Sequence, residues 1–128
     1  MPLYRCMVPE GRASLDQRSK ISTEVTRIHC EVTGAPPAFV HTFFSEDAGG
    51  ELPDGTCALM FGSIRSGRTD EQKQQLVSEM TDSVARILDS PADQVTVATV
   101  DVPASWVMEG GDVLPEPGEE AAWLEKHG

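Results

Sequence analysis

The chain has 128 residues, and its 21 acidic residues against 10 Lys and Arg give a formal net charge of −11. This length predicts one domain with a modest core, and a hydrophobic fraction of 39% excludes a disordered acidic chain. The acidic balance argues against nucleic-acid and anionic-membrane partners, because no surplus of basic residues is present to replace counterions. An anionic ligand would need a local cluster of cations.

Three widely spaced cysteines, Cys6, Cys30 and Cys57, include no C-x-x-C pair. Their number and spacing fit neither a disulfide framework nor a zinc site, so we expect no metal and a reducing, cytoplasmic compartment. No apolar run approaches the roughly 20 residues of a membrane helix. The N-terminus lacks the charged-then-apolar pattern of a signal peptide.

The first part of the chain has the pattern of a strand, a helix and a second strand. The apolar run 3–8 leads into Gly11-Arg12, and Ser14 with Gln17 then matches a capping box. Apolar residues follow at helical spacing and predict a helix with one buried face: Ile21, Val25, Ile28 and Val32. Residues 33–37 end this helix, and the strand-like run 39–44 follows.

The same order returns at an offset of 56 residues. The apolar run 59–64 leads into Gly67-Arg68, and Thr69 with Gln72 matches a second capping box. A second helical stripe follows, with Leu76, Met80, Val84 and Ile87-Leu88. This helix ends near residues 89–91, and the strand-like run 95–100 comes next.

We therefore predict a fold of the α/β (α+β) class, in which tandem β-α-β repeats form a four-stranded sheet with two helices on one face. The strands of each repeat should be parallel. We expect a single domain over residues 1–128, with a first unit at 1–44, a connector at 45–56, a second unit at 57–102 and an acidic tail at 103–128. The open face of such a two-layer protein is normally buried against other copies, so we expect an oligomer.

Charge is distributed unevenly along the chain. Residues 109–128 contain six acidic residues and one lysine, and we interpret this segment as a solvated tail anchored by Trp106 and Trp123. In contrast, no acid lies between Asp54 and Asp70, so the arginines between them are expected to form a small cationic pocket.

Proline at position 2 is the first candidate for chemistry. Removal of the initiator methionine would leave Pro2 with a free secondary amine. An α-amine has a pKa of about 8, and an apolar pocket or nearby arginines would lower it enough to make a base at neutral pH. If Met1 is retained, the nitrogen of Pro2 is an amide and no base.

Two segments carry a family resemblance. Residues 67–73 read Gly-Arg-Thr-Asp-Glu-Gln-Lys after a strand-like run, and residues 88–91 read Leu-Asp-Ser-Pro before another. Both resemble segments of 4-oxalocrotonate tautomerase. Relatives of that protein have a catalytic amino-terminal proline and a β-α-β unit, either as separate short chains or fused in tandem, and the tandem here resembles the fused branch.

Within that branch the chain is most similar to the cis-3-chloroacrylic acid dehalogenase group, over nearly its whole length. The matching segments are Met1-Pro2 with Tyr4, His29 before Thr33-Gly34, Arg65-Ser66-Gly67-Arg68, residues 103–110 with Glu109, and Leu114-Pro115-Glu116-Pro117-Gly118 with Trp123.

The resemblance implies a homotrimer that needs no metal or organic cofactor. It implies that Pro2 is the acid or base at a substrate carbon and that Glu109 activates water. By the same resemblance, a small carboxylate substrate is bound by Arg65, Arg68 and His29. Two guanidiniums suit that task because they can grip a carboxylate and stabilise charge that develops beside it.

One position departs from the dehalogenase pattern. The tyrosine that assists water activation in that group falls on Ala98, whose side chain forms no hydrogen bond. Keto–enol tautomerisation does not need that tyrosine, so we favour a tautomerase acting on a small unsaturated or 2-keto carboxylic acid. The alternatives are a cofactor-independent dehalogenase or hydratase of 3-haloacrylate or acetylenic acids, and a non-catalytic oligomeric binding module.

Each candidate residue also has a purely structural interpretation. His29 has apolar neighbours and suits a core or interface position. Arg65 and Arg68 could be ordinary turn and helix-start residues, although a cation at a helix N-terminus opposes the helix dipole. Glu109 begins the acidic tail and could be a solvated carboxylate, while Arg12 is interpreted as a relic of the repeat.

Overall fold

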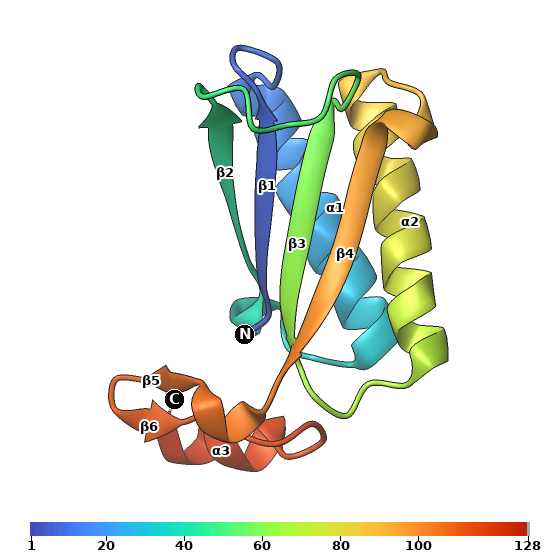
Figure 1. Ribbon diagram of the computed structural model, residues 1–128. Coiled ribbons are helices and arrows are strands. Elements are labelled where there is room, and N and C mark those ends of the chain that lie inside the picture. The colour runs from blue at the N-terminus through green and yellow to red at the C-terminus, as the bar shows by residue number, and fades with distance from the viewer. Residues whose placement is uncertain (128) are drawn as a thin grey trace.

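The computed structural model describes residues 1–127, and its centre is one four-stranded sheet (Figure 1). The strands lie in the order β2-β1-β3-β4. β1 pairs with β2 and β3 pairs with β4 in parallel, whereas β1 and β3 are antiparallel. The strands are β1 (Leu3–Pro9), β2 (His41–Asp47), β3 (Ala58–Arg65) and β4 (Val95–Val102). The predicted tandem of β-α-β units is confirmed.

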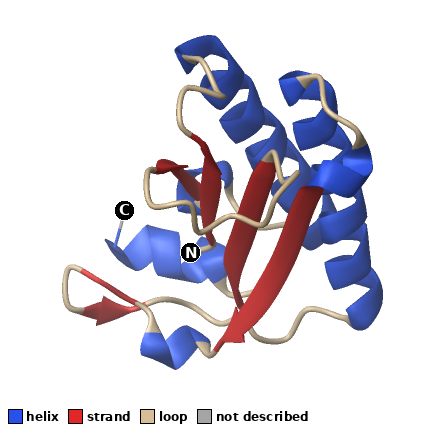
Figure 2. Ribbon diagram, turned by 45° about the horizontal axis from the view of Figure 1, so that its top comes forward, coloured by secondary structure: helices blue, strands red, loops and turns tan. Residues whose placement is uncertain are grey.

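Two helices of 19 residues each, α1 (Leu15–Thr33) and α2 (Asp70–Leu88), cover one face of the sheet (Figures 1 and 2). Their predicted apolar stripes are buried against the sheet and form the core with side chains of β1 and β3. The buried stripe residues are Ile21, Val25 and Ile28 on α1, and Leu76, Met80, Val84 and Leu88 on α2. No helix within residues 1–127 is long and apolar enough to cross a membrane.

Both predicted capping boxes are present at the helix starts. The side chain of Ser14 accepts a hydrogen bond from the N–H of Gln17 at 3.1 Å, and the Gln17 side chain accepts one from the N–H of Ser14 at 2.9 Å. In the same way, the side chain of Thr69 accepts from the N–H of Gln72 at 3.1 Å, and the Gln72 side chain accepts from the N–H of Thr69 at 2.9 Å. These bonds satisfy N–H groups that have no partner inside the helix.

The end of each helix is bound by residues from the start of the other helix. Arg12 donates to the carbonyl of Leu88 at the end of α2, and Arg68 donates to the carbonyl of Thr33 at the end of α1. The glutamines of the capping boxes add a second bond at each end, from Gln17 to Ile87 and from Gln72 to Val32. A cation is favourable at a helix C-terminus. The interpretation of Arg12 as a relic is therefore wrong, because Arg12 caps α2.

The strand predicted over residues 39–44 begins later, at His41. A 3₁₀ helix, η1 (Pro37–Phe39), occupies the residues before it. Proline fixes φ at about −65°, which favours a turn at this place. A second 3₁₀ helix, η2 (Ala92–Gln94), precedes β4 in the same way. As a result, Phe39 is buried beside the sheet instead of extending it.

The segment after β4 is folded, which corrects the interpretation of a solvated tail. It contains η3 (Ala104–Trp106), a hairpin of β5 (Met108–Glu109) and β6 (Asp112–Val113), and α3 (Glu120–His127). Leu114 is 3% exposed, and the ring of Trp123 packs edge-on against Phe39. Trp106 is no anchor, because it is 81% exposed. This segment lies across the end of the sheet where β1 begins (Figures 1 and 2).

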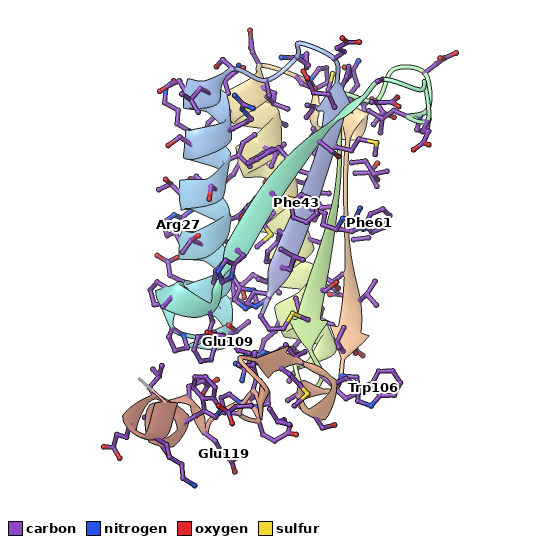
Figure 3. All side chains as sticks on the ribbon, turned by 90° about the vertical axis from the view of Figure 1, so that its left-hand side faces the viewer. Arg27, Phe43, Phe61, Trp106, Glu109 and Glu119 are labelled. Carbon is purple, nitrogen blue, oxygen red and sulfur yellow. The ribbon has the colours of Figure 1, made fainter. Side chains whose placement is uncertain are left out.

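The second face of the sheet is not covered by any of the described residues. Phe43, Phe61 and Val100 are 43%, 45% and 54% exposed there. Figure 3 shows Phe61 on the side of the sheet away from the helices. This open apolar face agrees with the expected two-layer arrangement.

Candidate active site

The chain begins at the end of the sheet that the C-terminal segment covers (Figure 1). Pro2 is buried, and its carbonyl accepts a hydrogen bond from the N–H of His41 at 3.1 Å. β1 lies between β2 and β3, so neighbouring strands flank the chain start on both sides. The predicted residue Pro2 is thus held within the protein rather than free in solvent.

The predicted residue His29 is held by Tyr4 of β1. The Tyr4 hydroxyl lies 2.8 Å from Nδ1 of His29, and both side chains are buried. Gly62 of β3 is the cross-strand partner of Tyr4, and a Cβ on Gly62 would lie only 2.3 Å from the tyrosine ring. A glycine at position 62 therefore leaves room for the tyrosine that positions His29.

Both groups of this pair are uncharged at neutral pH. Burial, with the charges of Arg68 and Arg65, lowers the pKa of His29 to about 3. Burial also raises the pKa of the Tyr4 hydroxyl well above its ordinary value. With the hydroxyl as donor to Nδ1, the proton of the imidazole resides on Nε2, which makes Nε2 a hydrogen-bond donor.

Arg65, at the end of β3, is bound by the C-terminal segment. Its side chain is 1% exposed, and Nη2 forms an ion pair with Oε1 of Glu120 at 2.7 Å. Nη1 donates to the carbonyl of Pro115 at 2.5 Å, and the guanidinium lies over the Phe39 ring. The expected pocket around the arginines is therefore not purely cationic, because the fold brings Glu120 to Arg65.

Arg68 lies in the turn between β3 and α2 and is partly buried. Burial and the charge of Arg65 lower the pKa of its guanidinium. Nη1 donates to the carbonyl of Thr33 at 3.3 Å. Nε is a buried donor with no hydrogen-bond partner among the described residues. Arg68 thus keeps a donor that a ligand could use.

The amino group of the chain links these residues. Its pKa is lowered by burial and then by the charge of Arg65, whereas Glu109 raises it. The same amine contributes to the low pKa of His29. Figure 3 shows Glu109 at the end of the sheet. The chain start is thus within electrostatic reach of His29, Arg65 and Glu109, and His29 is also within reach of Arg68.

Three residues of this region are not among the predicted site residues. The sequence indicates Tyr4 only as a core or pocket-wall residue, whereas the structure also makes it the partner of His29. Pro115 lies in a segment that carries the family resemblance, but no pattern assigns it a contact. Glu120 has no local signal, because it is one of several acids in the tail and lies 55 residues from Arg65.

Ala98 lies apart from this region within one chain. It pairs with Phe61 in the sheet, whereas Arg65 pairs with Val102, four residues further along β4. At about 3.3 Å per residue, this separation is roughly 13 Å along the strand. The position at which the dehalogenase group has a tyrosine is therefore not beside Arg65 in the same chain.

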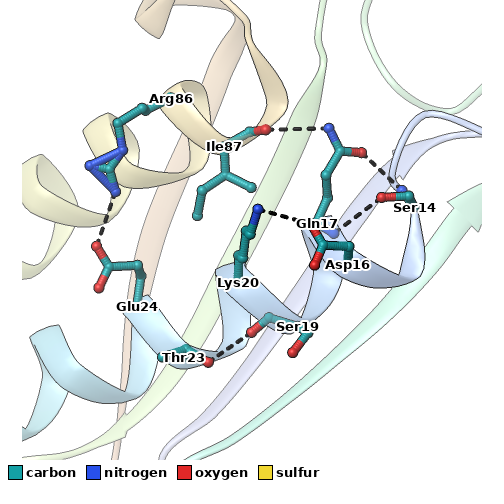
Figure 4. Close-up of a pocket in the computed structure, with 9 residues that line it drawn as sticks. All are labelled: Ser14, Asp16, Gln17, Ser19, Lys20, Thr23, Glu24, Arg86 and Ile87. Atoms are coloured by element: carbon teal, nitrogen blue, oxygen red, sulfur yellow. Dashed lines mark hydrogen bonds and ion pairs between the residues drawn. The ribbon is translucent and has the colours of Figure 1, made fainter.

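An open groove of about 810 Å³ lies elsewhere, between α1 and α2, and contains none of the predicted site residues (Figure 4). Its charged groups pair with one another, Lys20 with Asp16 at 2.9 Å and Arg86 with Glu24 at 3.0 Å. Such exposed pairs leave no buried polar group for a ligand to satisfy. Among the described side chains there is no group of three His, Cys, Asp or Glu arranged to hold a metal ion.

Known proteins resemble this chain in sequence and in fold. The profile of a family described as "Tautomerase enzyme" matches residues 63–115. A 2-hydroxymuconate tautomerase from Pseudomonas putida is 37% identical over 49 residues, which are 38% of this chain and 78% of that protein. A solved structure described as a member of the cis-3-chloroacrylic acid dehalogenase family has a TM-score of 0.86 at 31% identity, covering 96% of this chain and 90% of its own. The chain belongs to the tautomerase superfamily.

This tautomerase has the two-unit architecture of the fused relatives. A solved structure described as a fused 4-OT asymmetric trimer has a TM-score of 0.76 and covers 94% of this chain and 98% of its own, at 23% identity, which supports the fold alone. The match to the dehalogenase-family structure is stronger, because its TM-score of 0.86 and its identity of 31% are both higher. The resemblance predicted from the sequence is confirmed.

Proposed function

We propose that this tautomerase catalyses keto–enol proton transfer on a small unsaturated or 2-keto carboxylic acid, with the nitrogen of Pro2 as the base and then the acid. The proposal requires removal of Met1, which converts that nitrogen from an amide into a secondary amine. The observation that supports it is the position of Pro2, which is buried and is held by a hydrogen bond from His41, next to the Met1 amine, whose pKa burial and Arg65 lower. An amine that is neutral near pH 7 is a competent general base.

The proposed reaction moves one proton from oxygen to carbon. The neutral nitrogen of Pro2 takes the proton of the enol hydroxyl, and the C–O bond becomes a carbonyl as the electron pair of the double bond moves to the adjacent carbon. The Pro2 ammonium then donates its proton to that carbon, which restores the neutral amine. A positioned acid–base group of this kind accelerates a reaction by about 10²- to 10⁴-fold.

In this proposal the substrate carboxylate is bound by Arg68 and His29. Nε of Arg68 has no hydrogen-bond partner among the described residues, and Nε2 of the neutral His29 is a second donor. Hydrogen bonds from a guanidinium to a carboxylate are among the strong ones in proteins. Arg65 is not a donor to the carboxylate in this proposal, because its two terminal nitrogens already donate to Pro115 and Glu120.

We also propose that copies of the chain pack as a homotrimer through the open face of the sheet. The exposure of Phe43 and Phe61 on that face supports the proposal, as does the trimer described for a fused 4-OT. Light scattering is expected to show three chains, and Phe61→Glu is expected to give a monomer. A monomeric wild type would contradict this part of the proposal.

Pro2→Ala tests the proline mechanism. The mass of each purified protein first shows whether Met1 has been removed. With an enol pyruvate as substrate, the variant is expected to lose at least about 100-fold in kcat/KM, because a secondary amine in a fixed ring is replaced. Pro9→Ala, at the other end of the same strand, is the matched control and should retain activity. Unchanged tautomerisation by Pro2→Ala, or an active wild type that keeps Met1, would overturn the mechanism.

Dehalogenation of a 3-haloacrylate is the second candidate function. It is favoured by Glu109, whose carboxylate is exposed and acts on the amine of the chain start. In this reaction water adds to the halogen-bearing carbon as Glu109 accepts its proton, and the Pro2 ammonium donates a proton to the adjacent carbon. The resulting halohydrin then loses halide and its hydroxyl proton to give an aldehyde. Chloride release that is lost in Glu109→Gln and kept in Glu119→Gln would support it. A wild type that releases no chloride would exclude this candidate and leave the tautomerase proposal intact.

A further inference from the structure

Glu120 places a negative charge inside the proposed site. It is the first residue of α3, and its side chain is 13% exposed. Oε1 accepts from Arg65 at 2.7 Å, and Oε2 accepts from the N–H of Gly118 at 2.8 Å. Although burial acts in the opposite direction, hydrogen bonds from its own N–H and from Arg65 keep the pKa of this carboxyl below its usual value. Glu120 is therefore ionised at neutral pH.

The charges around the chain start nearly cancel within the described residues. Arg65 forms an ion pair with Glu120 at contact distance, and the chain-start amine adds no cation in the proposed mechanism, because it is neutral near pH 7. Arg68 forms no ion pair with a described acid, and its hydrogen bond goes to a backbone carbonyl. One cation thus remains for a ligand, and a carboxylate that leaves water needs a cationic or hydrogen-bonding partner.

We infer that Glu120 is a specificity-determining residue, which neutralises Arg65 and thereby selects monocarboxylate over dicarboxylate substrates. This inference rests on the proposed function, because it takes Arg68 as the residue that binds the substrate carboxylate. A second carboxylate near Arg65 would meet the charge of Glu120 with no unpaired cation to offset it. Like charges in such a site repel strongly, which gives specificity against the wrong ligand.

A purely structural role for Glu120 makes a different prediction. Glu120 and Pro115 together hold the guanidinium of Arg65, so the loss of Glu120 could loosen the C-terminal segment. Loosening would change the affinity for every ligand in the same direction. The ratio of two affinities isolates the charge effect, because a structural change common to both ligands cancels in the ratio.

Crotonate and fumarate form a suitable pair of probes, because they share a four-carbon trans skeleton and differ by one carboxylate. Their Kd values can be measured by calorimetry on the purified oligomer at fixed ionic strength. Wild type is expected to prefer crotonate. Glu120→Gln, which keeps the shape and removes the charge, is expected to shift the ratio toward fumarate by about tenfold or more, the scale on which two nearby unit charges interact in a protein.

Two control variants make the result specific. Glu120→Asp keeps the charge and should keep the crotonate preference of wild type. Glu119→Gln makes the same change in charge at the neighbouring exposed residue and should leave the ratio within about twofold of wild type, since exposed charges interact weakly.

The outcomes separate the inference from the proposed function. If Glu120→Gln changes the affinities for crotonate and fumarate by the same factor, the inference is wrong. Glu120 is then a structural residue or a competitor for the substrate carboxylate. Arg68→Ala should abolish the binding of both probes. If Arg68→Ala leaves both affinities unchanged, the proposed carboxylate site itself is wrong, and the inference fails with it.

Discussion

The two ends of the helical layer are built on one plan, and the candidate site lies at only one of them. At one end Arg12 and Gln17 bind the C-terminus of α2, and at the other Arg68 and Gln72 bind the C-terminus of α1. An arginine after a Gly turn is therefore a structural cap in both repeats. Its presence alone does not indicate a binding site.

The difference arises at the positions around the two caps. The strands of the two repeats correspond at an offset of 56 residues, and the helices at an offset of 55. The corresponding pairs, with the site residue first, are Pro2 and Ala58, Tyr4 and Met60, His29 and Val84, and Arg65 and Pro9. The tyrosine, the histidine and the arginine of the candidate site thus lie at one end, and apolar residues occupy the corresponding positions at the other end.

The C-terminal segment adds a second asymmetry. It lies across the end of the molecule at which the chain begins (Figure 2). There it supplies Glu120 and Pro115 to Arg65. The end with Arg12 has no counterpart of these contacts within residues 1–127. The two similar units therefore differ at their ends through a few residues and through the contacts of the C-terminal segment.

The strongest test of this comparison is to remove each arginine in turn. Arg68→Ala is expected to lower kcat/KM for a 2-keto acid by about 10- to 100-fold, because a hydrogen bond to a charged group contributes about 1.5–3 kcal/mol. Arg12→Ala should stay within about twofold of wild type. Both should lower the Tm by a similar amount, since both remove a helix cap. Equal losses of activity in the two variants would contradict the comparison.

Gly62→Ala tests whether the Tyr4–His29 pair depends on that glycine. The added Cβ would lie 2.3 Å from the Tyr4 ring, so we expect a loss of about 1–3 kcal/mol in the free energy of unfolding, as for other overpacked cores. In a Tyr4→Leu background the same substitution should cost much less. Urea unfolding of the four proteins gives this double-mutant cycle. Additive effects would show that the ring is not what Gly62 accommodates.

The pH dependence of stability should carry a contribution from His29. Its pKa falls from 6.5 in the unfolded chain to about 3 in the folded one, so below pH 6.5 the unfolded chain binds a proton that the folded chain does not. Stability is therefore lost as the pH falls from 6.5 toward 3, by about 1.4 kcal/mol per pH unit from this group. Urea unfolding between pH 7 and pH 4.5 should show a shallower decline for His29→Leu. Tyr4→Phe, which keeps the imidazole, should retain the steep decline, and parallel curves for wild type and His29→Leu would refute this assignment.

The smallest effects are expected from the two capping glutamines. Gln17→Ala and Gln72→Ala each remove one bond of a capping box and one bond to the opposite helix. Each should cost about 1 kcal/mol, the usual contribution of a cap or a hydrogen bond. Thermal unfolding followed by circular dichroism should give similar Tm shifts for both. A much larger shift for one of them would mean that the two ends are not equivalent as scaffolds.

Much of the fold follows from interactions that are local in the sequence. Ser14 and Gln17 are three residues apart, as are Thr69 and Gln72, so the two capping boxes can be recognised without a structure. The apolar stripes of α1 and α2 can likewise be recognised in the sequence, because apolar residues recur there at spacings of three and four. β2 begins two residues later than predicted, at His41, because the turn at Pro36 and Pro37 competes with the strand.

The candidate site divides in a similar way. The family resemblance identifies Pro2, His29, Arg65, Arg68 and Glu109 as site residues. In the structure the chain-start amine lies within electrostatic reach of Arg65 and Glu109, and His29 lies within reach of both arginines. Neither the Tyr4–His29 hydrogen bond nor the space that Gly62 leaves for the Tyr4 ring could be predicted from the sequence. Both depend on which residues of β1, α1 and β3 face one another, and this is set by strand register and helix packing.

The sequence by itself determined the tandem β-α-β order, the two caps, the family resemblance and an overall charge of −11. Only the tertiary structure decided how that charge acts at the site. An acid from the C-terminal segment neutralises Arg65 across 55 residues of sequence, while Arg68 forms no ion pair with a described acid. The physical reason is that composition sums charges over the whole chain, whereas a ligand experiences the few that folding buries within several ångströms of it.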